Sequence, residues 1–197
     1  MPVVLHPPGP EDRGAFLEAV HRSRRLHHPW TEPPDSTAAY ERWIARRDDP
    51  AEAPRIAWVV RTGEEDEPRR GRIVGVANLS RIGRGALLGA FAGWYGMADG
   101  TGRGWMAEAV SRLLDLAFGE LRLHRVEANV QPGNDPSRRL AARVGFRLEG
   151  FSPKYLRIGG AWRDHERWAM LAEEWTIGGG PRGTEPEPES EEPDPAD

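Results

Sequence analysis

The sequence predicts a mixed α/β fold, in which one central β-sheet carries helices on both of its faces. Apolar segments rich in β-branched and aromatic residues alternate with segments of helical periodicity along most of the chain. A glycine-rich turn joins one apolar segment to the most strongly amphipathic helix. The 197 residues, of which 38% are hydrophobic, are enough for a single domain with one core.

The first half of the chain is expected to form one strand, two helices and three further strands. Phe16, Leu17 and Val20 share one face of the first helix, and the prolines within residues 27–34 exclude a helix there. The expected elements are a strand at Val3–His6, helices at Glu11–Leu26 and Thr37–Arg47, and strands at Ile56–Arg61, Arg72–Leu79 and Ala86–Met97.

The second half continues the alternation of helix and strand. Val110, Leu113 and Ala117 form an apolar stripe on one helix, and Gly145 closes a shorter helix in the left-handed conformation. The expected elements are helices at Trp105–Glu120 and Asp135–Val144, and strands at Val126–Gln131, Phe146–Ile158 and Trp162–Leu171, the last two joined by a tight turn at Gly159-Gly160. The complete order is β-α-α-β-β-β-α-β-α-β-β.

Composition divides the chain into a domain of residues 1–175 and a tail of residues 176–197. The tail is rich in Pro and Glu and is expected to be disordered, either as a solvating extension or as a docking or autoinhibitory segment. It contains seven acidic residues and one Arg, so its net charge is −6. The whole chain has a net charge of −4, which leaves the domain near +2. A nearly neutral domain lacks the basic surface of a nucleic-acid-binding protein, so no nucleic-acid partner is expected.

The residues that are missing exclude several chemistries. The chain has no cysteine, which excludes disulfides and thiolate nucleophiles. The six histidines do not combine with carboxylates at metal-binding spacings, so no metal is expected. Neither a signal peptide nor an apolar segment long enough to span a membrane is recognisable, and a cytoplasmic location is therefore expected.

The glycine-rich turn between Gly96 and Gly104 is the most informative segment. Glycines let the backbone approach an anion closely, and the first N–H groups of the following helix lack internal partners at the positive end of the helix dipole. The segment therefore favours a phosphate-binding site, although an ordinary tight turn would have the same composition. The spacing excludes a P-loop and a dinucleotide-binding fingerprint.

This segment resembles the GNAT acetyltransferases. The run Thr101-Gly102-Arg103-Gly104-Trp105-Met106 lies in register with the Gln/Arg-x-x-Gly-x-Gly/Ala motif of that family, and its Gly-x-Gly-aromatic-Met-x-Glu-Ala form is similar to RimJ/RimL-type members. Thr101 and Met106 depart from the general motif. The resemblance implies the GNAT fold, with acetyl-CoA bound by Gly102, Arg103, Gly104, Trp105 and Met106.

Two further segments resemble the same family in the correct order. Asn134 and Ser137 match its Asn-x-x-Ser motif, which implies that both lie near the pantetheine and the thioester. Asn134 is also expected to cap the following helix, a role that capping alone would explain. The run Gly160-Ala161-Trp162-Arg163-Asp164-His165 is similar to the last hairpin of RimJ/RimL-type enzymes. In this hairpin His165 is expected to be structural, and a relay with Asp164 is the alternative.

The resemblance also implies how the reaction is catalysed. Backbone N–H groups near Gly96 and Met97 are expected to polarise the thioester carbonyl. Glu127 is the candidate general base, and a structural ion pair is the alternative reading for it. Ala141 stands where many family members have an acidic Tyr, so Ser137 is the candidate general acid.

The expected reaction is transfer of an acetyl group from acetyl-CoA to an amine, and the expected acceptor is the α-amine of a protein N-terminus. In the family, the loop after the first helix and the last hairpin border the acceptor groove, which makes Trp30 and Tyr155 candidate substrate contacts. The alternatives are acetylation of a small amine, such as an antibiotic or a polyamine, and a catalytically silent module that binds acyl-CoA. The protein is expected to be a monomer or a homodimer.

Overall fold

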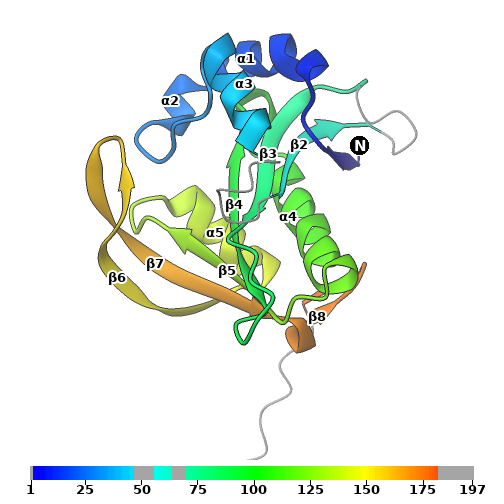
Figure 1. Ribbon diagram of the computed structural model, residues 1–197, viewed down its shortest axis with the longest axis vertical. Helices are drawn as coiled ribbons and strands as arrows, with labels where there is room; N and C mark the ends of the chain where they lie inside the picture. Colours follow the sequence, from blue (N-terminus) through cyan, green and yellow to red (C-terminus); the bar gives the residue numbers. More distant parts are fainter. Residues whose placement is uncertain (1, 47–55, 64–69, 182–197) are drawn as a thin grey trace, which may run out of the picture.

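A seven-stranded mixed sheet forms the centre of the protein (Figure 1). The computed structural model describes residues 2–46, 56–63 and 70–181. The strand order is β1-β2-β3-β4-β5-β7-β6, and every neighbouring pair is antiparallel except β4 and β5, which are parallel. The strands are β1 (Val3–His6), β2 (Ile56–Thr62), β3 (Ile73–Ser80), β4 (Gly89–Gly96), β5 (Arg125–Val130), β6 (Arg147–Ile158) and β7 (Ala161–Leu171).

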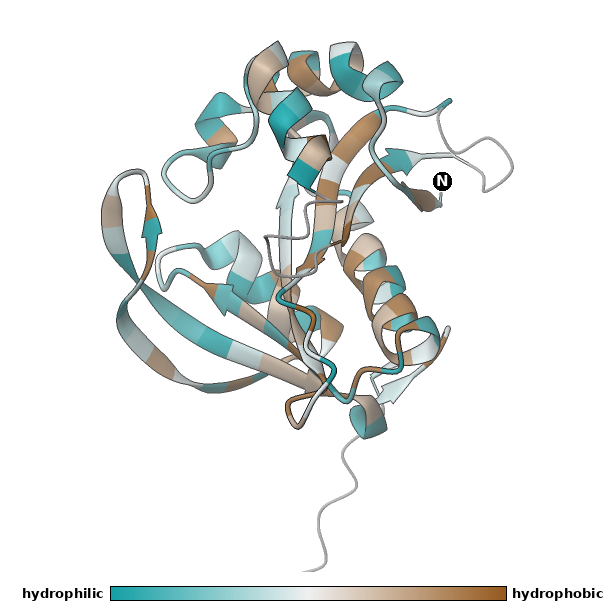
Figure 2. Ribbon diagram, viewed as in Figure 1, coloured by the Kyte–Doolittle hydropathy of each residue, from teal (hydrophilic) through white to brown (hydrophobic). Residues whose placement is uncertain are grey.

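Helices cover both faces of this sheet, as the sequence predicts. Apolar side chains of α1 and α3 pack on one face in a cluster that includes Phe16, Tyr40 and Val76, and this face is called the α1/α3 face below. Side chains of α4 and α5 form the larger cluster on the opposite, α4/α5 face. Figure 2 shows hydrophobic residues along β2 and β3 and alternating hydrophobic and hydrophilic residues along the helices. The helices are α1 (Arg13–Arg22), α2 (Arg24–His27), α3 (Thr37–Ala45), α4 (Trp105–Asp115) and α5 (Asp135–Val144).

The predicted helix at Glu11–Leu26 is interrupted at Ser23. A 3-10 turn, η1 (Pro10–Asp12), precedes α1, and Ser23 separates α1 from α2. The Ser23 hydroxyl donates to the carbonyl of Ala19 at 2.6 Å and accepts the N–H of Ala98 at 2.9 Å. This contact ties the end of α1 to η3 (Ala98–Gly100), the turn that follows β4. The interruption therefore depends on a residue 75 positions away.

The other predicted elements differ from the structure mainly at their ends. β1 and α5 have the predicted bounds, whereas β4 is shorter than predicted and begins at Gly89. The last turn of the predicted helix Trp105–Glu120 is a π-helix, η4 (Leu116–Glu120). The predicted end of the second helix, Arg47, lies outside the described residues. No helix among the described residues is long and apolar enough to cross a membrane.

The chain continues in order beyond the predicted domain end at residue 175. After η5 (Ala172–Glu174), β8 (Trp175–Thr176) pairs with β9 (Gly180–Pro181). The indole N–H of Trp175 and the backbone N–H of Gly178 both donate to one carboxylate oxygen of Asp115 in α4, at 2.8 and 2.9 Å. Residues 176–181, predicted as part of the tail, are thus attached to the domain, and residues 182–197 lie outside the described residues.

Candidate active site

Strands β4 and β5 are paired at one end only, over four residues of each strand. Pairing runs from Gly89 opposite Arg125 to Ala92 opposite Ala128 and stops there. Figure 1 shows the two strands leaving this shared end in different directions. The four last residues of β4 therefore present a sheet edge without a strand partner on the β5 side, within the described chain.

This edge carries backbone N–H groups that can polarise a carbonyl. The N–H of Met97 donates to the carbonyl of Val74 at 2.8 Å. Because N–H groups of a strand alternate between its two neighbours, those of Trp94 and Gly96 point to the β5 side. The expectation for Met97 is therefore corrected: its N–H group is already bonded to β3, and the donors at the open edge belong to Gly96 and Trp94.

The glycine-rich turn places a second set of backbone donors at the start of α4. Gly102 and Gly104 both have a φ of 76°, in the left-handed region that favours glycine. Gly104 is the N-cap of α4 and has no side chain to accept from the first turn. No group in the described chain accepts the N–H groups of residues 102–106. With the helix dipole behind them, these groups suit a phosphate.

Two glycines make room for Met106, one of the departures from the family motif. A Cβ on Gly75 of β3 would lie 2.2 Å from the Met106 sulfur, and one on Gly96 would lie 3.4 Å from its Cγ. Met106 thus packs across β3 and β4 at the start of α4. The larger side chain is compatible with the motif because Gly75 supplies the space.

Arg103 adds a positive charge beside these donors. Its guanidinium carbon lies 5.1 Å from the centre of the Trp105 ring, and the side chain is exposed. A cation held over an indole is partly ordered without losing its charge. Arg103 therefore suits an anionic ligand at this loop.

The start of α5 contributes the predicted cap. The Asn134 side-chain oxygen accepts the N–H of Ser137 at 3.3 Å. Arg138 fixes the helix to β7 through Glu166 at 3.0 Å, and also bonds Asp135 at 3.1 Å. The Ser137 hydroxyl and the Asn134 NH₂ group have no partner in the described chain. Both groups are thus available to a ligand.

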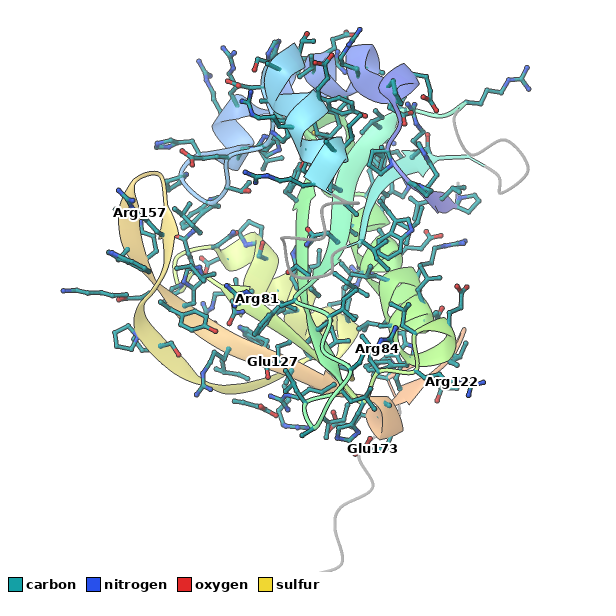
Figure 3. The ribbon with its side chains drawn as sticks, viewed as in Figure 1. Arg81, Arg84, Arg122, Glu127, Arg157 and Glu173 are labelled. Carbon is teal, nitrogen blue, oxygen red and sulfur yellow. The ribbon has the colours of Figure 1, made fainter. Side chains whose placement is uncertain are left out.

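Glu127 lies in an ion-pair network on β5. Arg125 donates to Glu127 at 2.7 Å and also donates to Glu149. The bond to Glu149 is the main cause that raises the pKa of Arg125, and the bond to Glu127 adds to it. Glu127 stands opposite Phe91, within the paired part of β4 and β5. Figure 3 shows it in the lower part of the sheet, far from the hairpin tip that carries Arg157. This placement favours the structural reading of Glu127.

The end of α2 and the loop that follows it bridge the two diverging strands on the α1/α3 face; contrary to the sequence-based expectation, His27 is still helical. His27 donates through Nε2 to the carbonyl of Gly96 at 2.9 Å, and Gln131 donates to the carbonyl of Trp30 at 3.1 Å. A Cβ on Gly133 would lie 3.2 Å from the Trp30 ring. Trp30, a predicted substrate contact, therefore covers the end of β5.

Tyr155 and His165 lie together on the β6–β7 hairpin. Their rings are 6.1 Å apart in an edge-to-face arrangement, and Tyr155 is partly exposed. His165 is buried and bonds the carbonyl of Arg163 through Nδ1 at 3.0 Å. Asp164 instead accepts the N–H of Lys154 at a bulge of β6. The Asp164–His165 relay is therefore not formed, and burial lowers the pKa of His165.

Three residues at this site were not predicted: Trp94, His27 and Asn129. Asn129 lies on β5 beyond the paired segment, and its side-chain oxygen is buried without a partner. The buried Tyr95 hydroxyl also lacks one. Glu127, Asn129 and Gln131 alternate along the strand and therefore share one face, but only the register with β4 shows that Asn129 stands at the opening.

Comparisons with known proteins agree with this geometry. The model of the acetyltransferase (GNAT) domain matches residues 3–147. The ribosomal protein uS5-alanine N-acetyltransferase of Escherichia coli is 33% identical over 170 residues, which are 85% of this chain and 87% of that protein. A probable N-acetyltransferase of Bacillus subtilis, YjcK, is 44% identical over 100 residues, and this match spans 51% of the chain and only 55% of that relative.

A solved structure shows the same architecture. RimJ of Mycobacterium smegmatis, in complex with CoA-disulfide, superposes with a TM-score of 0.75 at 31% sequence identity. The superposition covers 87% of this chain and 83% of that one.

Proposed function

The chain belongs to the GNAT family of acetyl-CoA-dependent acetyltransferases, and we propose that its acceptor is the α-amine of a protein N-terminus. Relatedness over most of the chain to an enzyme named for an alanine of a ribosomal protein supports this acceptor class. The observation that carries the proposal is the opening between β4 and β5. It has backbone donors at its edge and a loop containing Trp30 across its α1/α3 side.

The residues of the α4/α5 side fit acetyl-CoA. The free N–H groups of residues 102–106 suit its pyrophosphate, and Arg103 adds a charge. The free amide of Asn134 suits a carbonyl of the pantetheine arm. When bound, acetyl-CoA supplies a thioester, whose carbonyl carbon is the electrophile.

We assign the chemistry to groups around the opening. The N–H groups of Trp94 and Gly96 polarise the thioester carbonyl and stabilise the developing negative charge. The Ser137 hydroxyl, unpartnered at the start of α5, gives a proton to the departing sulfur. Glu127 is the weaker candidate for the base, because its carboxylate is bonded by Arg125 and lies within the paired part of β4 and β5.

Thiol release from acetyl-CoA tests the proposal. The purified protein is offered short peptides with free α-amines, the same peptides with blocked N-termini, and small amines that include spermidine. We expect turnover of free peptides only. Turnover confined to small amines would overturn the assigned acceptor class, and tight acetyl-CoA binding without turnover of any amine would favour a silent binding module.

A further inference from the structure

The ring of His27 is fixed at the edge of β4 where the reaction is expected. The N–H and C=O of one strand residue point to the same side. The carbonyl of Gly96, which binds His27, therefore lies at the same open edge as the Gly96 N–H group. The N–H groups of Trp30 and Thr31 in turn donate to the His27 carbonyl at 2.7 and 3.0 Å, which fixes the backbone of this loop.

The bond to Gly96 determines which ring nitrogen of His27 is free. A carbonyl only accepts, so Nε2 must carry the proton. In the neutral ring, Nδ1 then has a lone pair, and no described residue bonds it. The ring packs edge-to-face on Tyr95 at 5.4 Å between centroids and is 5% exposed.

Further unsatisfied polar atoms lie on the same face of the sheet. Val126, Ala128 and Val130 point into the α4/α5 core, so Asn129 projects toward the α1/α3 side. The Asn129 side-chain oxygen and the Tyr95 hydroxyl are both buried without partners. Buried polar atoms are normally hydrogen-bonded. Asn129 lies beyond the paired part of β5, where β4 presents its open edge, and its unpartnered oxygen indicates that a ligand completes it.

We propose that Nδ1 of His27 accepts a proton from the acceptor amine, while the Asn129 oxygen receives a second N–H of the same amine. This inference rests on the proposed function. The ammonium loses one proton to Nδ1, and the amine lone pair forms the N–C bond with the thioester carbon. The C–S bond breaks, its electron pair leaves with sulfur, and sulfur takes the second nitrogen proton by way of Ser137. The imidazolium finally releases its proton to water.

The surroundings of His27 keep the ring neutral near pH 7. Burial, the main cause, lowers its pKa, and the bond to Gly96 opposes this in part. The titratable groups on the elements around it are Tyr95 of β4, Asp99 of η3, the exposed Arg24 and Arg25 of α2, His28 next to it, and four residues of α1: Arg13, Glu18, His21 and Arg22. Arg22 is paired with both Glu18 and Asp99. None of these charges is a cause of the lowered pKa.

A weak neutral base selects among amines. A peptide α-ammonium has a pKa of roughly 7.7–8.0, and a lysine side chain or similar alkylammonium has one of about 10.4. His27 with a pKa below 6.5 deprotonates the first with a small free-energy cost and the second with a much larger one. The acceptor class that fits is therefore the α-amine of a peptide, and not an alkylamine.

The test is the pH dependence of kcat/KM on a peptide with a free α-amine. His27→Gln is the informative variant, because its side-chain NH₂ can still donate to Gly96 while the base is lost. On the acidic side of the profile, we expect the wild-type rate to fall only below pH 6.5. In His27→Gln the fall should begin near pH 7.7–8.0, where the amine itself is protonated, with a loss of about 20-fold at pH 6.5.

His165→Gln is the matched control, because His165 is also a buried histidine whose pKa is lowered by burial. Its pH profile should stay that of the wild type. The inference is overturned if the rate of His27→Gln, like that of the wild type, falls only below pH 6.5. It is also overturned if His165→Gln shifts the pH at which the rate falls. A loss of thermal stability and acetyl-CoA affinity in His27→Gln with an unchanged pH profile would show a structural role. If the wild type acetylates no peptide, the proposed function itself fails.

Discussion

The two sides of the opening between β4 and β5 differ in the kind of polar group that they present, backbone groups on one side and side chains on the other. On the α4/α5 side, the groups that suit acetyl-CoA are mainly backbone N–H groups, those of residues 102–106 and of Trp94 and Gly96. On the α1/α3 side, the polar groups are side chains of three separate elements, His27, Tyr95 and Asn129. A backbone site tolerates substitution wherever glycine geometry is kept, whereas a side-chain site changes with each residue. We infer that the first side determines the cofactor and the second determines the acceptor.

The largest effect is expected from Ser137→Ala, the one side chain on the α4/α5 side to which we assign chemistry. Loss of a general acid typically reduces kcat by about 10²-fold or more. The Ser137 N–H still donates to Asn134, so α5 keeps its cap. Calorimetry should show an unchanged dissociation constant for acetyl-CoA. A steady-state kcat within threefold of the wild type would contradict the assigned role.

A smaller effect, on the affinity for acetyl-CoA, is expected from Gly104→Ala, which changes only the backbone geometry of the glycine-rich turn. Gly104 has a φ of 76°, and no atom lies within 4 Å of an added Cβ. The cost is thus backbone strain of about 1–2 kcal/mol, which corresponds to roughly tenfold weaker acetyl-CoA binding by calorimetry if the loop refolds. The KM for peptide should not change.

Gly14→Ala is the matched control for that substitution. Gly14 lies within α1, and an added Cβ would also meet nothing within 4 Å. Alanine favours a helix over glycine by about 1 kcal/mol, so this variant should be slightly more stable and bind acetyl-CoA normally. Equal affinity losses in both variants would show that the loop geometry is unimportant.

These sides also differ in how far the sequence predicts them. The start of α5 was predicted to the residue, because Asn134 and Gly145 are local signals for a cap and a termination. The break at Ser23 was not, because it depends on a hydrogen bond to Ala98. His27 is the last residue of the short helix α2, next to a proline-rich loop without periodicity, and only the fold brings it to Gly96. Local motifs thus predict the α4/α5 side of the opening, whereas the α1/α3 side depends on long-range contacts.

A small effect is expected from Glu127→Gln. The Glu127 carboxylate is held by Arg125 and lies below the opening, and Arg125 keeps Glu149 as a partner in the variant. We expect kcat/KM to change by less than about threefold, because Glu127 lies within the paired part of β4 and β5 and has no assigned part in the reaction. A loss of 10²-fold together with an altered pH profile would instead identify Glu127 as the base.

The smallest effect is expected on the pH dependence of the free energy of unfolding. Histidine side chains, among them His27 on the α1/α3 side, should determine this dependence. Burial lowers the pKa of His27 and of His165 below 6.5, so the unfolded chain binds more protons than the folded one in that range. Stability should therefore fall as the pH drops below 6.5. Thermal unfolding of His27→Gln between pH 5 and 7 should show a weaker dependence, and an identical slope would contradict the burial of a neutral ring.

The most direct test of the central claim is a competition between two amines in one reaction. A peptide with a free N-terminus and an internal lysine is incubated with acetyl-CoA at pH 7.5, and mass spectrometry locates the acetyl group. The account predicts acetylation at the α-amine with at least a 100-fold preference, because roughly a third of α-amines but only about one lysine in a thousand is neutral at this pH. Equal or greater acetylation of the lysine would contradict it.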